Sequence, residues 1–325
     1  TDMMPLQGIN RSIVKYGLES LNKSKRPGLK AILETAAIEK IGVYEIGFMI
    51  GPRLNASGRI DSALTALRLL CTHDLEKAKT WAVALNDVNQ ERQLMTAQMT
   101  EAAKTLTRHK DEDRIIIVQD ESFHQGIIGL IAGKLTDKYY LPSIVISRRD
   151  GISKASARSI SGFNIIEAIR KSDNLLINAG GHPMAAGFTI ETQKIEMFME
   201  SISAYAKENI KGEMLERKLR IDAPLPLGVL TLELYKQISR LEPYGNGNPE
   251  PVFSASGTVD FIRTVGAEGK HLKLTIDGMS AIAFNQGSLF LKIRVGDKIS
   301  FAYSLALDTY NGGNKLQLKI KDILR

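Results

Sequence analysis

The sequence is poor in the residues that build disulfides and membrane spans. It has 325 residues and one cysteine, Cys71, so no internal disulfide can form, which suits a reducing cytoplasm. No apolar run approaches the roughly 20 residues that cross a bilayer, and no signal peptide precedes the first helical segment. We therefore expect a cytoplasmic protein without a membrane contact. Because Cys71 ends an apolar run, we expect it to be buried.

Histidines and nucleotide-binding signatures are also scarce. The five histidines include no adjacent pair, and no cysteine cluster accompanies them. Metal-assisted phosphoryl chemistry usually brings several carboxylate or imidazole ligands to one or two ions, and this chain does not carry a full set. A phosphate-binding lysine loop and a dinucleotide fingerprint are both missing. These absences argue against an ATPase, a dehydrogenase or a self-contained metal enzyme.

The charge balance permits an acidic partner without requiring one. The net charge is +7, the isoelectric point is about 9.3, and aromatic residues make up 6% of the chain. A basic protein of this kind can bind a polyanion such as nucleic acid. With so few aromatic residues, extended base stacking is not expected to dominate that binding.

The first two thirds of the chain read as helices followed by an α/β layer. Helical patterns cover residues 29–48, 61–70 and 74–109, and the last is a long segment without Gly or Pro, either a rigid connector or a bundle helix. Strand patterns at 115–118, 143–147, 154–159 and 188–190 then alternate with helices at 126–139, 165–171 and 192–211. This alternation predicts a sheet buried between helices.

The last third reads as β structure. Five segments alternate apolar and polar residues between glycine-containing turns, at 252–264, 271–276, 280–284, 298–303 and 315–323, after a lone helix at 230–240. Five short strands in a row match a small closed barrel such as an OB-fold. The predicted fold is therefore α/β plus all-β: a helical connector, an α/β domain and an OB-like barrel.

The segment from Gly180 to Gly187 is the most suggestive motif. Gly180, Gly181 and His182 precede a run of small residues, after an apolar segment. Glycine lets a backbone approach a ligand closely, its amides suit phosphate oxygens, and histidine adds a donor. Taken alone, a tight turn between a strand and a helix is the more common reason for such a pattern.

Three further motifs carry polar groups suited to phosphate. In one, Arg53, Asn55 and Arg59 surround what reads as a turn marked by Gly and Pro, and arginine forks bind phosphate in two places. In another, alternation along a strand places Ser156 and Arg158 on one face together with a lysine.

The third of these motifs is His124-Gln125-Gly126, which opens a helix and so suggests an anion site, although a plain helix start is as good a reading. The loop at 243–251 is rich in Gly, Asn and Pro, so we expect a structural role for it.

Taken together, the motifs resemble the RecJ family of bacterial single-stranded-DNA-specific 5′–3′ exonucleases, in the DHH phosphoesterase superfamily. The resemblance runs along essentially the whole chain and is carried by residues 1–6, 26–29, 51–59, 124–129, 156–160, 180–187 and 244–253. It implies the end of a DHH domain with its connecting helices at 1–110, a DHH-associated domain at 111–212, and an OB-type domain for single-stranded DNA at 213–325.

The resemblance also implies roles for particular residues. Asp2 matches a metal-binding aspartate for Mn²⁺ or Mg²⁺, and the other ligands would lie upstream of Thr1. Arg158 and His182 match catalytic positions that face the phosphate at the metal centre. The positions that match substrate-binding residues are Arg53, Asn55, Arg59, His124, Ser156, Arg158, Gly180, Gly181 and His182.

Three functions stay open from the sequence. The first is the substrate-clamping part of such an exonuclease in DNA repair and recombination, binding DNA without cleaving it on its own. The second is a phosphodiesterase for short oligonucleotides or cyclic dinucleotides, and the third is a non-catalytic single-strand-binding module. Expected partners are single-stranded DNA and a helicase or single-strand-binding protein, with the chain itself a monomer. The barrel residues considered for contact with DNA are Lys270, His271, Lys273, Tyr303, Tyr310, Lys315 and Lys319.

Overall fold

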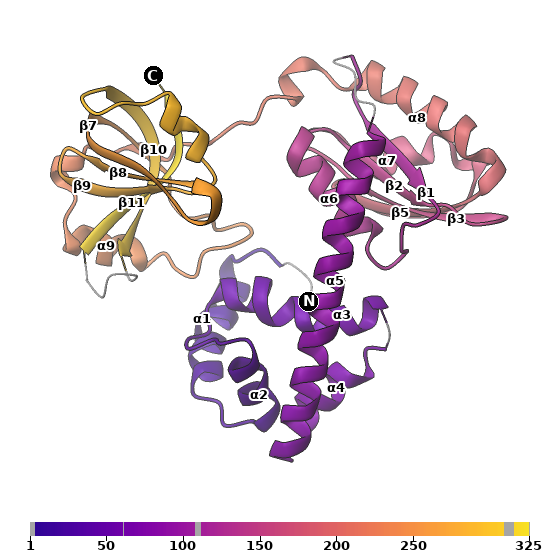
Figure 1. Ribbon diagram of the computed structural model, residues 1–325, viewed down its shortest axis with the longest axis horizontal. Coiled ribbons are helices and arrows are strands. Elements are labelled where there is room, and N and C mark those ends of the chain that lie inside the picture. The colour runs from indigo at the N-terminus through magenta and orange to yellow at the C-terminus, as the bar shows by residue number, and fades with distance from the viewer. Residues whose placement is uncertain (1–3, 61, 108–111, 309–314, 325) are drawn as a thin grey trace. The chain divides into compact units, whose positions relative to one another are not determined.

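The computed structural model describes residues 4–60, 62–107, 112–308 and 315–324, and the chain forms two compact units (Figure 1). The first unit is Ser24–Lys218. The second joins helix α1 (Gly8–Asn22) to the chain that follows Leu219. Across the described ranges, no helix is both long and apolar enough to cross a membrane.

The first unit begins with helices. Their bounds are α2 (Pro27–Thr35), the π-helical turn η1 (Glu45–Ile50), α3 (Gly51–Ile60), α4 (Leu64–Cys71) and α5 (Leu75–Leu106). The single helix predicted over 29–48 is wrong, because α2 ends at Thr35 and Ala37 has a left-handed backbone. The turn predicted at 51–59 is also wrong, since these residues are helical. Proline is tolerated near the start of an α-helix, and Pro52 is the second residue of α3.

Helix α5 is both a connector and a packed helix. Asp74 caps it by accepting hydrogen bonds from the backbone amides of Glu76 and Lys77. Helices α2, α3 and α4 pack against it, and so do helix α6 and strand β1 of the following layer. Cys71, the last residue of α4, is exposed rather than buried, because α4 turns Leu69 and Ala66 toward its neighbours instead.

A mixed five-stranded sheet follows in the described part of this unit, in the order β1–β2–β3–β5–β4 (Figure 1). Only β1 and β2 are parallel. The strands are β1 (Ile116–Asp120), β2 (Ser143–Ser147), β3 (Ile152–Arg158), β4 (Leu176–His182) and β5 (Ala185–Glu191). The helices are α6 (Ile128–Tyr139), α7 (Ile165–Arg170) and α8 (Ile195–Asn209).

Helices cover both faces of this sheet, as the alternation predicts. Alternate residues of β1 and β2 divide between two cores, so that Val118 and Val145 pack with α6 while Ile144 and Ile146 pack with α7 and α8. The predicted α/β layer is confirmed. Strand β4, at the edge of the sheet, is mostly exposed, which is why its sequence lacks a strong strand pattern.

The glycine–histidine motif forms a hairpin and not a turn into a helix. Strand β4 carries Gly180, Gly181 and His182, which pair with β5 in antiparallel register, and the chain reverses at Pro183 and Met184. Gly181 has φ of 149°, and a β-carbon there would lie 2.4 Å from the carbonyl oxygen of Ala185. The close pairing of two strands therefore requires glycine at this position.

The second unit is an OB-like barrel that nearly closes. Its elements are β6 (Ala223–Pro224), α9 (Leu232–Ser239), β7 (Phe253–Val265), β8 (His271–Ile276), β9 (Met279–Ala283), β10 (Lys298–Asp308) and β11 (Lys315–Leu324). Long strand β7 pairs with both β8 and β10, which brings the sheet back on itself. The predicted all-β part is thus confirmed.

One residue considered for DNA contact lies inside this barrel. Tyr303 has no exposed surface, and its hydroxyl donates a hydrogen bond to the carbonyl of Leu225 at 2.6 Å. The prediction that it reaches DNA is wrong, because the alternation along β10 turns its ring into the core among residues such as Phe301. Tyr310 lies outside the described residues.

The loop at 243–251 has the structural role that its composition indicates. The hydroxyl of Tyr244 donates to the carbonyl of Ile238, and the side-chain amide of Asn248 donates to the carbonyls of Leu241 and Pro243. The loop also holds the chain before α1, because the amide of Leu6 donates to the carbonyl of Asn246.

Candidate functional site

Strand β3 presents a polar face beside a bare strip of backbone. Ala155 and Ala157 are buried, whereas Ser156 and Arg158 face the other side, as the alternation predicts. Across the sheet, Ser156 lies opposite Gly187, which lies opposite Gly180. Two residues further along the strands, Arg158, Ala185 and His182 form a parallel row. The two rows leave Ser156, Arg158 and His182 on one face, separated by residues with little or no side chain.

The first turn of α6 lies against this face. A β-carbon on Gly129 would lie 3.0 Å from Oγ of Ser156 and 3.1 Å from Nη2 of Arg158, closer than ordinary van der Waals contact. The Arg158 guanidinium is also held by its own strand, because Nη1 donates to the carbonyl of Ala157 at 2.8 Å and to Oγ of Ser156 at 3.3 Å. Glycine at 129 therefore allows the guanidinium to lie beneath the helix.

Arg59, at the end of α3, reaches the place where the first turn of α6 lies against Ser156 and Arg158. We call this place the arginine corner, or simply the corner. Its Nη1 donates to the carbonyl of Gly126 at 3.1 Å. A β-carbon on Gly126 would come within 2.1 Å of the Arg59 carbonyl oxygen, so the two segments touch backbone to backbone. His124 stabilises this turn, because its Nδ1 accepts a hydrogen bond from the amide of Gly126 at 3.1 Å. The motif that opens α6 is thus a docking point for α3.

A third arginine, Arg92, belongs to the corner, although none of the sequence motifs includes it. Arg92 of α5 donates from Nη2 to Oδ1 of the buried Asn89 at 3.0 Å. Burial lowers the pKa of Arg92 and of Arg158, and the charge of nearby Arg59 lowers both further. Polar residues at helical spacing with buried ones (Asn89, Arg92 and Thr96) are the sequence signal that points to it.

In the part of the chain that the structure describes, no carboxylate compensates these three guanidinium groups. Within the described ranges, none of the ion pairs involves Arg59, Arg92 or Arg158. Like charges held together without a counter-charge favour an anionic ligand. The chemistry of the corner, with arginine forks, a serine hydroxyl and a histidine on the same face, is that of a phosphate site.

Two of the predicted substrate residues lie elsewhere on α3. Arg53 donates from Nε to Oδ1 of Asn86 at 3.1 Å and from Nη1 to the carbonyl of Met49 at 2.8 Å, so its guanidinium joins α3 to α5. Arg53 and Arg59 are six residues apart on a helix, which turns them to different sides. Asn55 is exposed on α3. Their contacts with substrate stay predictions.

The described residues do not provide a metal centre. No three His, Cys, Asp or Glu side chains gather in the part of the chain that the structure describes, and Asp2 lies outside it. The corner offers arginine, hydroxyl and imidazole groups, whereas Mg²⁺ and Mn²⁺ prefer carboxylate oxygens. These residues therefore fit a phosphate and not its metal ion.

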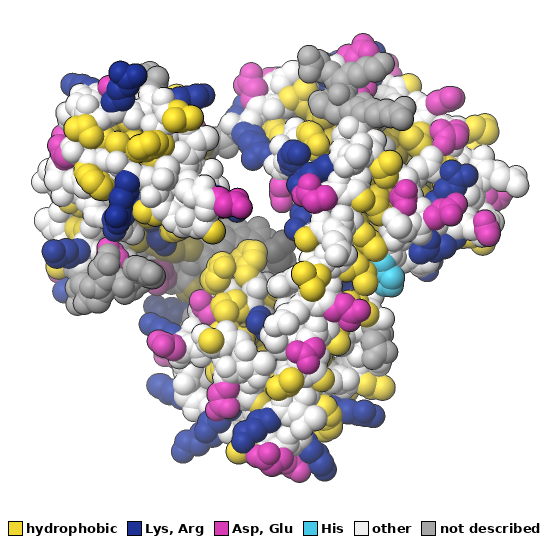
Figure 2. All heavy atoms as spheres, in the orientation of Figure 1, with side chains coloured by type: hydrophobic (Ala, Val, Ile, Leu, Met, Phe, Trp, Pro, Cys, Tyr) yellow, Lys and Arg dark blue, Asp and Glu magenta, His cyan; other side chains and the backbone are white. Residues whose placement is uncertain are grey.

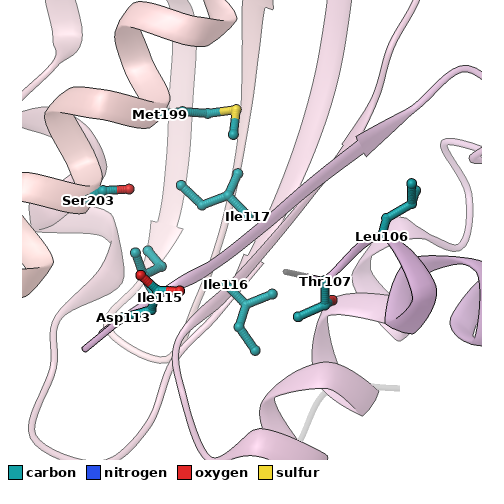
Figure 3. Close-up of a pocket in the computed structure, with 8 residues that line it drawn as sticks. All are labelled: Leu106, Thr107, Asp113, Ile115, Ile116, Ile117, Met199 and Ser203. Atoms are coloured by element: carbon teal, nitrogen blue, oxygen red, sulfur yellow. The ribbon is translucent and has the colours of Figure 1, made fainter. Parts of the chain in front are cut away.

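The pocket in Figure 3 is a separate feature. It measures about 300 Å³ and is lined from β1, α8 and the end of α5 by Leu106, Thr107, Asp113, Ile115, Ile116, Ile117, Met199 and Ser203. Its lining is apolar apart from one carboxylate and two hydroxyl groups, and it includes no cation. The described residues of this lining therefore offer a phosphate no positive partner.

Comparison with known proteins identifies the two β-containing parts. Residues 112–208, which span the mixed sheet, match the DHHA1 domain, and residues 221–322, which span the barrel, match the RecJ OB domain. The chain is RecJ-like. It is homologous to RecJ exonucleases over 99% of its length.

The relatives are longer than this chain. Single-stranded-DNA-specific exonuclease RecJ of Bacillus subtilis is 34% identical over 99% of the chain, which covers 42% of that protein, and RecJ of Escherichia coli is 29% identical with 59% covered. The crystal structure of Thermus thermophilus RecJ with Mn²⁺ superimposes with a TM-score of 0.87 at 30% identity, over 99% of this chain and 47% of that one. A Mg²⁺ complex of the same protein gives the same score. The chain spans about half the length of the curated relatives it matches.

Proposed function

We propose that this chain is the substrate-clamping part of a metal-dependent 5′–3′ single-stranded-DNA exonuclease, and that alone it binds DNA without cleaving it. The observation that carries the proposal is the arginine corner beside the bare strip of β5 and β4, where Arg59 and Arg92 approach the DHHA1 domain that holds Arg158, with a RecJ OB domain following in the chain. The names of the relatives, single-stranded-DNA-specific exonucleases, give the substrate class. DNA repair and recombination are the processes in which such an activity would act.

Phosphates would bind on the face shared by Ser156 and Arg158. The guanidinium of Arg158 offers paired donors to phosphate oxygens, and the hydroxyl of Ser156 lies beside it. Gly187 and Gly180 continue that row without side chains, so a nucleic-acid backbone can approach the sheet. Arg59 adds positive charge from the opposite side of the α6 turn.

His182 would act on the phosphate that reacts. It is exposed at the end of β4 in the row of Arg158, where an imidazole can donate to a phosphate oxygen as charge develops. Mn²⁺ or Mg²⁺, held by residues outside the described ranges, would supply the activated water. The residues of this chain would hold the phosphate, orient it and neutralise its charge.

The barrel distinguishes this proposal from the other two functions. A phosphodiesterase for short oligonucleotides or cyclic dinucleotides has no need of a RecJ OB domain, whereas a strand-processing nuclease does. A non-catalytic binding module describes what the chain would do in isolation. A helicase or a single-strand-binding protein would be a natural partner for the full nuclease, and we propose a cytoplasmic monomer.

Binding of a short 5′-phosphorylated single-stranded oligonucleotide, followed by fluorescence anisotropy, tests the proposal. Arg158→Met should weaken binding roughly 10- to 100-fold, as expected for the loss of charge-assisted hydrogen bonds to a phosphate. Arg170→Met is the matched control, since Arg170 is exposed at the end of α7 on the opposite face of the sheet. Equal affinity for the parent chain and both variants would remove the phosphate site from the proposal.

A further inference from the structure

Arg92 lies on the side of α5 that meets the turn before α6. On one side of it along the helix, Asn86 accepts a hydrogen bond from Arg53 of α3. On the other side, the sulfur of Met99 accepts one from the amide of His124. Met99 is seven residues from Arg92, about two turns, and shares its side of α5, whereas Asn86 is six residues away and lies on another side. Burial lowers the pKa of Arg92, and the positive charge of Arg59, which contacts Gly126 in that turn, lowers it further, so the two guanidinium groups lie near each other at this corner.

The guanidinium of Arg92 is only partly satisfied there. Nη2 donates to Asn89, but Nε is buried and has no hydrogen-bond partner among the described residues. A buried donor without a partner costs free energy, and a buried charge without a counter-charge costs more. Among the described residues no carboxylate forms an ion pair with Arg92, and burial and the like charge of Arg59 both lower its pKa.

A purely structural role would leave this arrangement unexplained. Arg92 could join two helices as Arg53 does, but Arg53 uses Nε and Nη1 in two hydrogen bonds to neighbouring segments. The side chain of Arg92 donates to Asn89, one turn earlier on its own helix, and to no other residue that the structure describes. Its remaining donors are left for a group that the protein does not supply.

We propose that Arg92 is a third phosphate-binding guanidinium, which takes an oxygen of the substrate phosphate held by Arg59 and Arg158. This inference rests on the proposed function and extends it to helix α5. The helix that connects the two halves of the unit then also forms one wall of the binding site. Three elements distant in sequence, α3, α5 and β3, each contribute one arginine.

The first test compares Arg92→Met and Arg92→Lys with the control Arg68→Met in the 325-residue chain. Arg68 is an exposed arginine of α4. We expect Arg92→Met to weaken oligonucleotide binding about tenfold, the loss typical of one charge-assisted contact. The slope of log affinity against log salt should shrink by roughly 0.7, as for one single-strand phosphate contact. Arg92→Lys should keep the slope and lose part of the affinity, because it retains charge but not the fork.

The second test uses inorganic phosphate and does not depend on DNA. Phosphate that binds the folded chain raises its melting temperature, and Arg92→Met should reduce that increase while Arg68→Met leaves it unchanged. An Arg92→Met variant that folds, binds the oligonucleotide with the parent's affinity and slope, and keeps the full phosphate effect would overturn the inference.

The outcomes also separate this inference from the proposed function. If Arg158→Met loses binding and Arg92→Met does not, the phosphate site stands and Arg92 is a structural residue. If neither variant changes binding, the site itself is wrong. Should Arg92→Met fold poorly, Arg92→Lys decides the matter: a phosphate-binding arginine predicts a smaller phosphate-induced stabilisation in this variant, whereas a structural arginine predicts the parent's full stabilisation.

Discussion

Arg158 and His182 come from different strands and meet on one face only because β5 pairs with both β3 and β4. In a chain extended to the length of its relatives, Arg158→Ala and His182→Ala should each remove most of the cleavage and leave the fold intact. Both side chains are expected to contact the phosphate, and neither belongs to a hydrophobic core. Steady-state cleavage together with circular dichroism checks this. Near-normal cleavage by both variants would contradict the assignment.

Tyr303 gives the barrel a pH dependence at the alkaline end. Burial raises its pKa to about 12, whereas an unfolded tyrosine loses its proton near pH 10. The stability that the buried, neutral Tyr303 contributes is thus fully present below about pH 10 and is lost as the pH rises toward 12. Tyr303→Phe should reduce this alkaline loss by an amount on the order of 2 kcal/mol, measured by urea unfolding between those pH values. Burial also raises the pKa of Tyr244 to about 12, so Tyr244 should account for loss of stability at alkaline pH that persists in the Tyr303→Phe variant.

At the scale of elements, helix α6 offers a matched pair of glycines. Gly129 lies against Ser156 and Arg158, whereas a β-carbon on Gly133 would meet nothing within 4 Å. Gly133→Ala should stabilise the chain by up to about 1 kcal/mol through helix propensity and leave DNA binding unchanged. Gly129→Ala should displace the Arg158 guanidinium and weaken binding several-fold. Equal DNA affinity for the two variants would show that the α6 turn does not position Arg158.

Prediction from sequence succeeds for elements with a clear period and fails where glycine carries the signal. Helix α5 and the barrel strands follow from spacing alone, because burial of one face fixes their pattern. Helix α3 was predicted as a turn, since Gly51 and Pro52 resemble loop residues although both fit a helix start. Strand β4 was missed because an exposed edge strand rich in glycine shows neither alternation nor an apolar run.

The residues of the candidate site also differ in whether a local sequence pattern predicts them. Ser156 and Arg158 are predictable from alternation along one strand. The approach of Arg59 to Gly126 depends on two segments far apart in sequence, and so no local pattern reports it. Arg92 could be suspected only from polar residues on a buried helical face, a signal that does not say what the guanidinium meets.

At the scale of the whole molecule, both units carry positive charge that can bind DNA. The net charge of +7 and the unpaired arginines predict DNA binding that weakens steeply with salt. Figure 2 shows lysine and arginine side chains on both units, with hydrophobic ones between them on the barrel. In a plot of log affinity against log salt concentration, we expect each phosphate contact to make the slope more negative by roughly 0.7. An affinity independent of salt would mean that phosphates are not the main contacts.

The most direct test of the central claim incubates the 325-residue chain with 5′-phosphorylated single-stranded DNA and Mn²⁺, and follows binding and product release together. The account predicts salt-sensitive binding that Arg158→Met weakens roughly 10- to 100-fold, with no product above the control without protein. Metal-dependent release of nucleotides by the chain would contradict the account, because the chain would then have to form a working metal centre by itself. Failure to bind DNA at low salt would contradict the phosphate site itself.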